Sequence, residues 1–414
     1  MQKILLLLFA FCILLLLLRF GQFYTSRKPL PDQKEITFIT TITQAKPKAN
    51  RIYYTVLYAK HQITLQASSS QQFDFGTRIK VSGKIKAMRA ENANRVWYLV
   101  EFPKMEKVKD PGMFTRLANT VRGRITATFE KTLPPVSAAL LTGIVFGQKA
   151  SMPKQFENSL AKTGVLHVIA ASGMNVSLVA GGILWLVSQF LKRQVAVGVA
   201  IASIGFYAVL AGLQPSIVRA ALMGSIAFAA TLLGRQYTVL FALFLTGFCM
   251  LLFDPMLISD LGFQLSFLAT LGIVVIQPLV FGKQQKGIVA MIKADLAITF
   301  SAQITTVPLL LSAFSSYGLL SLLTNALVLW TVPIILLGGM IIGVTSLIIP
   351  FFASILLYLL YPLLLFFEYI VSILGRLPVV VSLEALPWQI SIGYYCILLA
   401  VILVKRKRAQ LGLQ

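Results

Sequence analysis

The sequence predicts a polytopic α-helical membrane protein that carries a small all-β barrel outside the membrane. The first observation is composition, since 57% of the residues are hydrophobic and 12% are charged, whereas an ordinary soluble domain has about 25% charged residues. The mean hydropathy is accordingly high, at +0.80. The second observation is that several stretches reach the roughly 18 to 20 uncharged residues that cross a bilayer. The third is one long polar segment, residues 21–112, with strand-like alternation.

Residues 1–20 are predicted to form an N-terminal transmembrane anchor. An uninterrupted apolar run follows Lys3 and ends at Arg19. A cleaved signal peptide is the alternative, but the sequence has no small-residue cleavage site between this run and Phe23. The pattern therefore favours an anchor that is retained.

Residues 24–112 are predicted to form a small barrel. Thr, Val, Ile, Tyr and Phe alternate there with polar residues, which is typical of strands. The expected strands are 35–43, 52–60, 62–67, 77–85 and 95–102. Five short strands in about 75 residues favour an oligonucleotide-binding (OB) fold.

This polar segment is also strongly basic. The whole chain has 37 Lys and Arg residues against 14 Asp and Glu, and residues 21–112 contain 16 basic and 7 acidic residues. Cytoplasmic loops of membrane proteins collect Lys and Arg, but a long translocated domain has no topological need for them. An anionic polymer or an anionic lipid is therefore the expected partner.

An amphipathic interfacial helix is predicted over residues 113–133. Apolar residues recur there at roughly helical spacing among Arg116, Arg122, Arg124 and Lys131. Such a helix is expected to lie at the membrane surface, where it joins the barrel to the transmembrane bundle.

The transmembrane bundle is predicted over residues 134–404, followed by a basic cytoplasmic tail over residues 405–414. The expected spans are 164–190, 194–212, 216–233, 237–253, 256–281, 288–313, 317–350, 351–374 and 389–404. With the anchor they give about 10 crossings of the inner (plasma) membrane. The basic loops place both termini in the cytoplasm and the barrel outside. Two full crossings by 317–350 would leave the C-terminus outside, so we expect residues 322–333, with Asn325 and Pro333, to form a re-entrant segment.

Several polar residues lie inside the predicted spans, where they are costly unless they are paired or face water. The Ser-Gly pair at 172–173 predicts a locally opened helix that faces a polar cavity, and hydrogen-bonded helix packing is the alternative. Arg219 has no acidic neighbour in the sequence, so it requires an anion: Asp260, another carboxylate or a phosphate group. The candidate channel-lining residues are His167, Ser172, Asn175, Gln214, Ser216, Arg219, Asp260, Gln264 and Asn325.

An enzymatic or metal site is not predicted. Ser172 and His167 are five residues apart, which on a regular helix points their side chains about 140° apart. The sequence contains neither a nucleophile elbow nor an HExxH motif. The two histidines, His61 and His167, lie far apart, and the three cysteines lie in apolar runs without metal-ligand spacing. We therefore expect no catalytic residue, no metal and no cofactor.

Three motifs occur in the order HVIAASGMNV (167–176), AGLQPSIVRAALMG (211–224) and DPMLISDLGFQLSFLATLG (254–272). In this order they resemble the transmembrane domain of the ComEC family of DNA-uptake proteins. Asn175 stands where the family has a second histidine, so a role that needs imidazole there is in doubt. The sequence has no HxHxDH pattern, so the metallo-β-lactamase-like domain of many members is expected to be absent.

The resemblance implies a channel for single-stranded DNA across the cytoplasmic membrane during natural transformation. It also implies DNA binding by the barrel, for which the candidates are Lys80, Lys84, Lys86, Arg95, Tyr54 and Trp97. Because the sequence has no nucleotide-binding loop, energy is expected from a cytoplasmic motor or a gradient, and strand degradation from a separate nuclease. Whether the chain forms a homo-oligomer stays open. An intramembrane enzyme, a lipid or small-molecule transporter and a DNA-binding scaffold are the alternatives.

Overall fold

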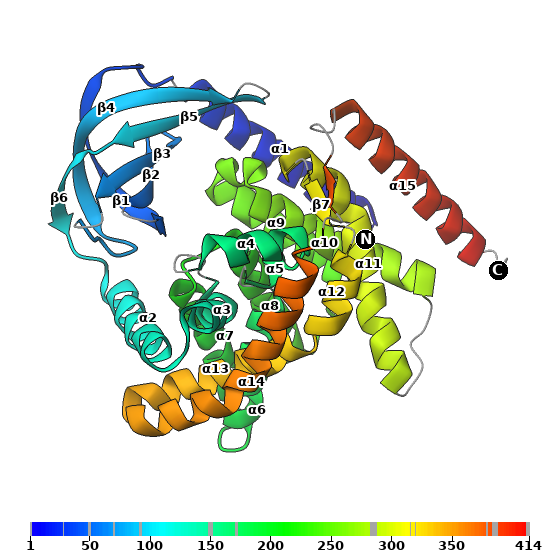
Figure 1. Ribbon diagram of the computed structural model, residues 1–414. Coiled ribbons are helices and arrows are strands. Elements are labelled where there is room, and N and C mark those ends of the chain that lie inside the picture. The colour runs from blue at the N-terminus through cyan, green and yellow to red at the C-terminus, as the bar shows by residue number, and fades with distance from the viewer. Residues whose placement is uncertain are drawn as a thin grey trace.

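In the computed structural model, a β-barrel sits at one end of a mostly helical protein (Figure 1). The structure describes residues 2–27, 29–48, 51–68, 71–90, 93–147, 152–169, 173–281, 288–314, 316–318, 320–377, 380–382 and 388–410. The barrel comprises β1 to β6, and the helices α2 to α15 follow it in the chain. The expectation of a small barrel joined to a helical bundle is therefore confirmed.

The barrel is closed by five strands. They are β1 (Glu35–Lys48), β2 (Arg51–Tyr58), β3 (His61–Ser68), β4 (Arg78–Ala90) and β5 (Ala93–Glu101). The strand order is β1-β2-β3-β5-β4, and β4 pairs again with β1 to close the barrel. All these pairs are antiparallel except β3 with β5. Alternate side chains point inward, and Val56, Ile63, Leu65, Val81 and Val100 are fully buried at the centre.

The strands differ from the sequence prediction at β1, at β4 and in a sixth strand. β4 runs to Ala90, whereas its predicted end was residue 85. β1 continues through Lys48, because residues 46–48, which read as a turn, pair with Arg51, Ile52 and Tyr53 of β2. A sixth strand, β6 (Lys104–Lys109), pairs with β4 outside the barrel closure. Its sequence, KMEKVK, is mostly charged because all but Met105 face outward, so it lacks the enrichment in β-branched and aromatic residues that marks a strand.

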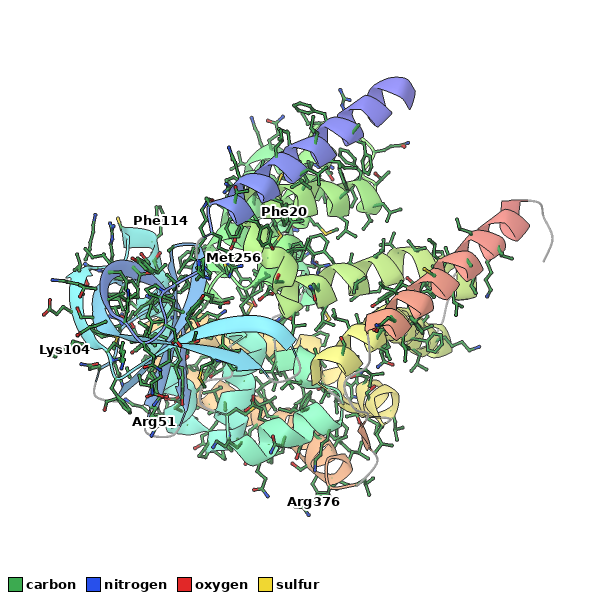
Figure 2. The ribbon with its side chains drawn as sticks, turned by 90° about the horizontal axis from the view of Figure 1, so that it is seen from above. Phe20, Arg51, Lys104, Phe114, Met256 and Arg376 are labelled. Atoms are coloured by element: carbon green, nitrogen blue, oxygen red, sulfur yellow. The ribbon has the colours of Figure 1, made fainter. Side chains whose placement is uncertain are left out.

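The first helix, α1 (Gln2–Thr25), packs on α9 (Val239–Phe253), far along the chain. The Phe9 and Phe244 rings lie 4.9 Å apart, and Arg19 Nε donates to the carbonyl oxygen of Leu252 at 3.0 Å. Figure 2 places Phe20 of α1 near Met256 of the 3-10 helix η1 (Pro255–Ser259). The first helix is therefore built into the helical part of the protein.

Helix α2 (Met113–Thr132) joins the barrel to the helices. Its apolar face contacts the rest of the protein through Ala118, Ile125 and Phe129, which are buried. Asn119 Nδ2 donates to the carbonyl oxygen of Phe75 in the barrel at 2.9 Å. The predicted amphipathic helix is present, while its placement at a membrane surface stays a prediction.

The remaining helices form the bundle. They are α3 (Pro135–Phe146), α4 (Lys154–Lys162), α5 (Leu166–Ile169), α6 (Gly173–Ser188), α7 (Arg193–Leu210), α8 (Pro215–Leu232), α10 (Leu261–Phe281), α11 (Ile288–Phe314), α12 (Ser321–Val328), α13 (Thr331–Ile348), α14 (Pro350–Leu374) and α15 (Trp388–Gln410). Six helices of the described chain are long and apolar enough to cross a membrane. This finding supports a polytopic membrane protein.

The segment predicted to be re-entrant does not form one continuous helix. Helix α12 has 8 residues, about 12 Å of helix, which is too short to cross a bilayer. The break between α12 and α13 lies at Leu329 and Trp330. Asn325 and Pro333, where we expected the break, lie instead inside the two helices. Proline fits there because Pro333 is the third residue of α13, where its missing N–H has no partner within the helix.

Candidate functional site

The short helix α3 lies at the centre of the bundle, where ten of its 12 residues are buried. Its carboxyl end is held by three side chains from later parts of the chain. Asn175 of α6 donates to the carbonyl oxygen of Ile144, Tyr207 of α7 to Val145, and Gln214 to Gly147, each at 2.8 Å. Because the last carbonyl groups of a helix have no partner within it, these donors make burial of this helix end feasible.

Two of the expected channel-lining residues therefore have a structural contact. Asn175 is 1% exposed, so it does not line an open path in this conformation. Gln214 is half-buried and reaches α3 from a tight turn in which Gly212 (φ +76°) and Leu213 (φ +52°) both adopt the left-handed conformation. Asn175 and Gln214 thus bind the end of a helix that is distant in the sequence. This finding supports hydrogen-bonded helix packing as the role of these two residues.

The amino end of α3 meets a carboxylate that the sequence analysis did not single out. Ser137 Oγ donates to Glu368 Oε2 of α14 at 3.0 Å. A negative charge is favourable near the first turn of a helix, where backbone N–H groups are free. The signal in the sequence was one acidic residue in the 25 residues of α14, which are otherwise uncharged.

In the described chain α5 ends at Ile169 and α6 begins at Gly173, and because residues 170–172 lie outside the described residues, the opening at the Ser-Gly pair stays a prediction. Ser172 lies outside the described residues. His167 belongs to α5, but its side chain also lies outside the described part of the structure. The alternative of a Ser172–His167 catalytic pair therefore stays untested.

Arg219 lies in the first two turns of α8 and is 8% exposed. Its Nη1 donates to the carbonyl oxygen of Ser266 on α10 at 3.0 Å. Its Nε has no hydrogen-bond partner, and no described carboxylate lies within salt-bridge distance of it. The Gly173 residue at the start of α6 lies so close that a Cβ there would be 2.8 Å from Nη2.

Asp260 does not pair with Arg219. Its side chain accepts from the backbone N–H of Phe263 at 2.8 Å, at the start of α10, and Asp260 is exposed. Gln264 donates to the carbonyl oxygen of Ile258 at 2.6 Å. Of the three anions considered for Arg219, Asp260 is thus excluded in this structure, because its carboxylate caps the helix that follows it.

The two other channel candidates are also placed. Ser216 Oγ lies 3.4 Å from the carbonyl oxygen of Gly262, so the start of α8 is beside the start of α10. Asn325 of α12 is buried, and its Oδ1 has no hydrogen-bond partner. Gly173 of α6 and the first turns of α8 and α10 therefore lie together around Arg219, whereas Asn325 belongs to α12.

On the barrel, Tyr54 is a core residue and not an exposed aromatic platform. It is 1% exposed, donates to the carbonyl oxygen of Gln71 at 2.7 Å and accepts from Phe73 N–H at 2.9 Å. Burial raises the pKa of its hydroxyl. Tyr54 was therefore wrongly expected to bind DNA, because the alternation of β2 turns this ring inward.

The remaining barrel candidates are on the surface. Trp97 is 46% exposed and pairs across β4 and β5 with the exposed Met88. Lys86 is ion-paired with Glu101 at 2.6 Å. Lys80 and Lys84 are exposed, and each lies opposite an acidic residue in the sheet, Glu106 and Glu35 respectively. The Arg95 side chain lies outside the described residues.

One further surface feature is an aromatic ring beneath a cation. Phe102 is 59% exposed, and the Arg51 guanidinium lies 5.5 Å from the centre of its ring. Phe102 has φ +45°, a conformation that is an outlier for a bulky side chain. Strained residues concentrate at functional sites. Both residues belong to the basic segment 21–112, but the sequence alone could not place them together.

Comparison with known proteins identifies the helical part. Residues 144–408, more than half of the chain, match the family described as Competence protein. The chain belongs to the Competence protein family. All three sequence motifs, and thus Arg219 and the residues around it, lie within the matched range.

Three relatives each match more than half of this chain. ComE operon protein 3 of Bacillus subtilis (strain 168) is 24% identical over 245 residues, which are 58% of this chain and 30% of that protein. An uncharacterized protein of Aquifex aeolicus (strain VF5) is 27% identical over 266 residues, 60% of each chain. The uncharacterized protein YcaI of Escherichia coli (strain K12) is 26% identical over 243 residues, 52% of this chain and 31% of that protein. The chain thus spans between about a third and three fifths of these relatives. No solved structure matches significantly.

Proposed function

We propose that this protein is a channel for the uptake of single-stranded DNA across the cytoplasmic membrane during natural transformation. Membership of the Competence protein family supports a role in DNA uptake. Six helices of membrane-crossing length support a membrane pathway. A barrel with a net positive charge, joined to these helices by α2, supports capture of an anionic polymer.

The barrel is proposed to be an OB fold. Five strands close it in the order β1-β2-β3-β5-β4, which agrees with the five-stranded Greek-key barrel of this fold. OB folds bind single strands with a basic groove and with aromatic rings on which bases stack. The face around strands 2 and 3 is the usual ligand face, and Arg51 begins β2.

Phe102 is the observation that carries the proposal. Its exposed ring lies at the end of β5, and its N–H donates to the carbonyl oxygen of Gln66 in β3 at 2.8 Å. An exposed ring held in a strained conformation beside Arg51 presents one face to a base and a cation to a phosphate. Trp97, on the β4–β5 hairpin that projects from the barrel toward the helices (Figure 1), supplies a second exposed ring.

The proposed topology places both termini in the cytoplasm and the barrel outside. In Figure 1 the N and C ends lie on the side of the protein away from the barrel. The basic residues that follow Val404 agree with a cytoplasmic C-terminus. About 10 crossings, with α12 as a re-entrant helix, agree with these positions.

The conduit is proposed to act with other components and not as an enzyme. A cytoplasmic motor or a gradient would drive the strand, and a separate nuclease would degrade its complement. Assembly into a homo-oligomer is part of this proposal only if a single chain proves too narrow for a strand.

The test is binding of single-stranded DNA by the purified full-length chain in detergent. An oligothymidylate of about 16 nucleotides spans the site of one OB fold. We expect affinity to fall steeply with salt, as released counterions require. Phe102→Ala and Trp97→Ala should each lower affinity by about 1 to 3 kcal/mol, whereas Met88→Ala should not. Transformation frequency of cells that carry the same variants should fall in the same order. Absence of binding even at low salt would contradict the proposal.

A further inference from the structure

Arg219 is a buried cation without a carboxylate. At 8% exposure its charge is largely removed from water, which is costly unless an anion or several hydrogen bonds compensate. One hydrogen bond, from Nη1 to the carbonyl oxygen of Ser266, is present. No described acidic side chain forms an ion pair with it, and the carboxylate of Asp260 is already used on Phe263 N–H. Arg219 therefore lacks a compensating charge.

The hydrogen bond to Ser266 also fixes which edge of the guanidinium is free. Nη1 is occupied, and Nε has no partner. Within the described chain Nη2 also makes no hydrogen bond. Nε and Nη2 lie on the same edge of the planar group and together form the fork that binds two oxygen atoms of a phosphate or carboxylate. Arg219 thus presents an unused two-donor edge inside the bundle.

Nη2 lies against Gly173 of α6. A Cβ at Gly173 would lie 2.8 Å from Nη2 and 3.5 Å from the Cβ of Ala220. A glycine at this position therefore leaves the room that the guanidinium occupies. A buried guanidinium without a compensating charge is unfavourable by itself and favourable with an anion bound to its two free donors.

We propose that the Nε–Nη2 edge of Arg219 forms a site for one phosphate-type oxyanion. Its ligand is a tetrahedral group with at least two free oxygen atoms, and Gly173 leaves the guanidinium the room to present this edge. In the conducting protein this ligand is one phosphodiester of the DNA strand, a statement that rests on the proposed function. Binding of the oxyanion itself does not depend on that function.

The probes are inorganic phosphate and sulfate, compared with chloride at equal ionic strength, on the full-length chain in detergent. Thermal unfolding and equilibrium binding are both measured. We expect phosphate and sulfate to raise the unfolding temperature and chloride to have no such effect. Arg219→Lys keeps the charge but removes the fork, so it should weaken phosphate binding about tenfold. Gly173→Ala should weaken binding similarly, whereas Gly181→Ala on the same helix, where a Cβ meets nothing, should not.

Two further arms identify the source of the oxyanion. A short thymidine dinucleotide with one phosphodiester and phosphatidylglycerol are each tested as competitors of phosphate. Competition by the dinucleotide supports the DNA assignment, and competition by the lipid alone would overturn it while the oxyanion site stands. Equal phosphate binding by wild type and Arg219→Lys would overturn the site itself. If Gly173→Ala does not fold, Arg219→Lys still decides between these outcomes. If Arg219 binds no oxyanion, DNA binding by the barrel is still expected. Failure of the Arg219 site is therefore distinguishable from failure of the proposed function.

Discussion

The Nη1 atom of Arg122 donates a hydrogen bond to the carbonyl oxygen of Leu210, 3.0 Å away. Leu210 is the last residue of α7, so a cation of α2 binds the free carbonyl end of another helix. Nη2 of the same arginine donates to Asn119 Oδ1 at 2.9 Å, and Asn119 in turn donates to Phe75 of the barrel. A continuous chain of hydrogen bonds thus connects the barrel to the carboxyl end of α7.

Arg122→Gln is expected to destabilise the junction between barrel and bundle. It removes a half-buried charged donor from the carbonyl oxygen of Leu210 and from Asn119 Oδ1, which should cost about 2 to 3 kcal/mol of unfolding free energy. Arg124→Gln is the matched control, because Arg124 is on the same helix with an exposed side chain. Thermal unfolding in detergent measures both variants. Equal unfolding temperatures for the two would show that the Arg122 contacts contribute nothing.

The packing of α1 predicts that the first helix stays on the mature protein. Arg19 holds the carboxyl end of α9, and Phe9 contacts Phe244. We expect intact-mass measurement of the purified membrane protein to include residues 1–25. Both rings are exposed, at 48% for Phe9 and 56% for Phe11. Because Phe9 contacts Phe244, Phe9→Ala should lower the unfolding temperature more than Phe11→Ala. A mature chain that begins after Thr25 would contradict this prediction.

The alternation of residues was enough to predict the barrel, and the apolar runs were enough to predict the bundle. Strand β6 was missed because only one of its six residues, Met105, is buried, so its sequence lacks the alternation of apolar and polar residues that predicts a strand. The break between α12 and α13 was predicted from Asn325 and Pro333, but it lies at Leu329 and Trp330. Local sequence thus located elements better than it located their ends.

The candidate site was predictable in its residues and not in their partners. Polarity inside an apolar run identified Asn175, Gln214 and Arg219. Their acceptors lie on α3 and α10, between 31 and 67 residues away in sequence. No local pattern encodes such distant pairings. The same limit explains why Asp260 was offered as a partner of Arg219, although it caps its own helix.

Tyr54 and Trp97 are predicted to separate stability from DNA binding. Tyr54→Phe removes the hydroxyl that bonds Gln71 and Phe73, which should cost about 1 to 3 kcal/mol of stability because a buried N–H loses its partner. It should leave DNA affinity unchanged. Trp97→Phe should change neither the stability nor the DNA affinity, because it keeps an exposed ring. Thermal unfolding and oligonucleotide binding on the same preparations measure both quantities, and weaker DNA binding by folded Tyr54→Phe would contradict the assignment of this ring to the core.

Phe102 makes a prediction in which stability and affinity change in opposite directions. Its left-handed backbone conformation costs a non-glycine residue roughly 1 to 2 kcal/mol, and the following residue, Pro103, restricts it further. Phe102→Gly should relieve this strain, so the unfolding temperature is expected to stay equal or to rise. The same change removes the ring beside Arg51, so affinity for single-stranded DNA should fall as much as in Phe102→Ala. Phe102→Ala retains the strain and serves as the control. If Phe102→Gly instead unfolds earlier with its DNA affinity intact, the ring is a structural residue and the stacking platform lies elsewhere on the barrel.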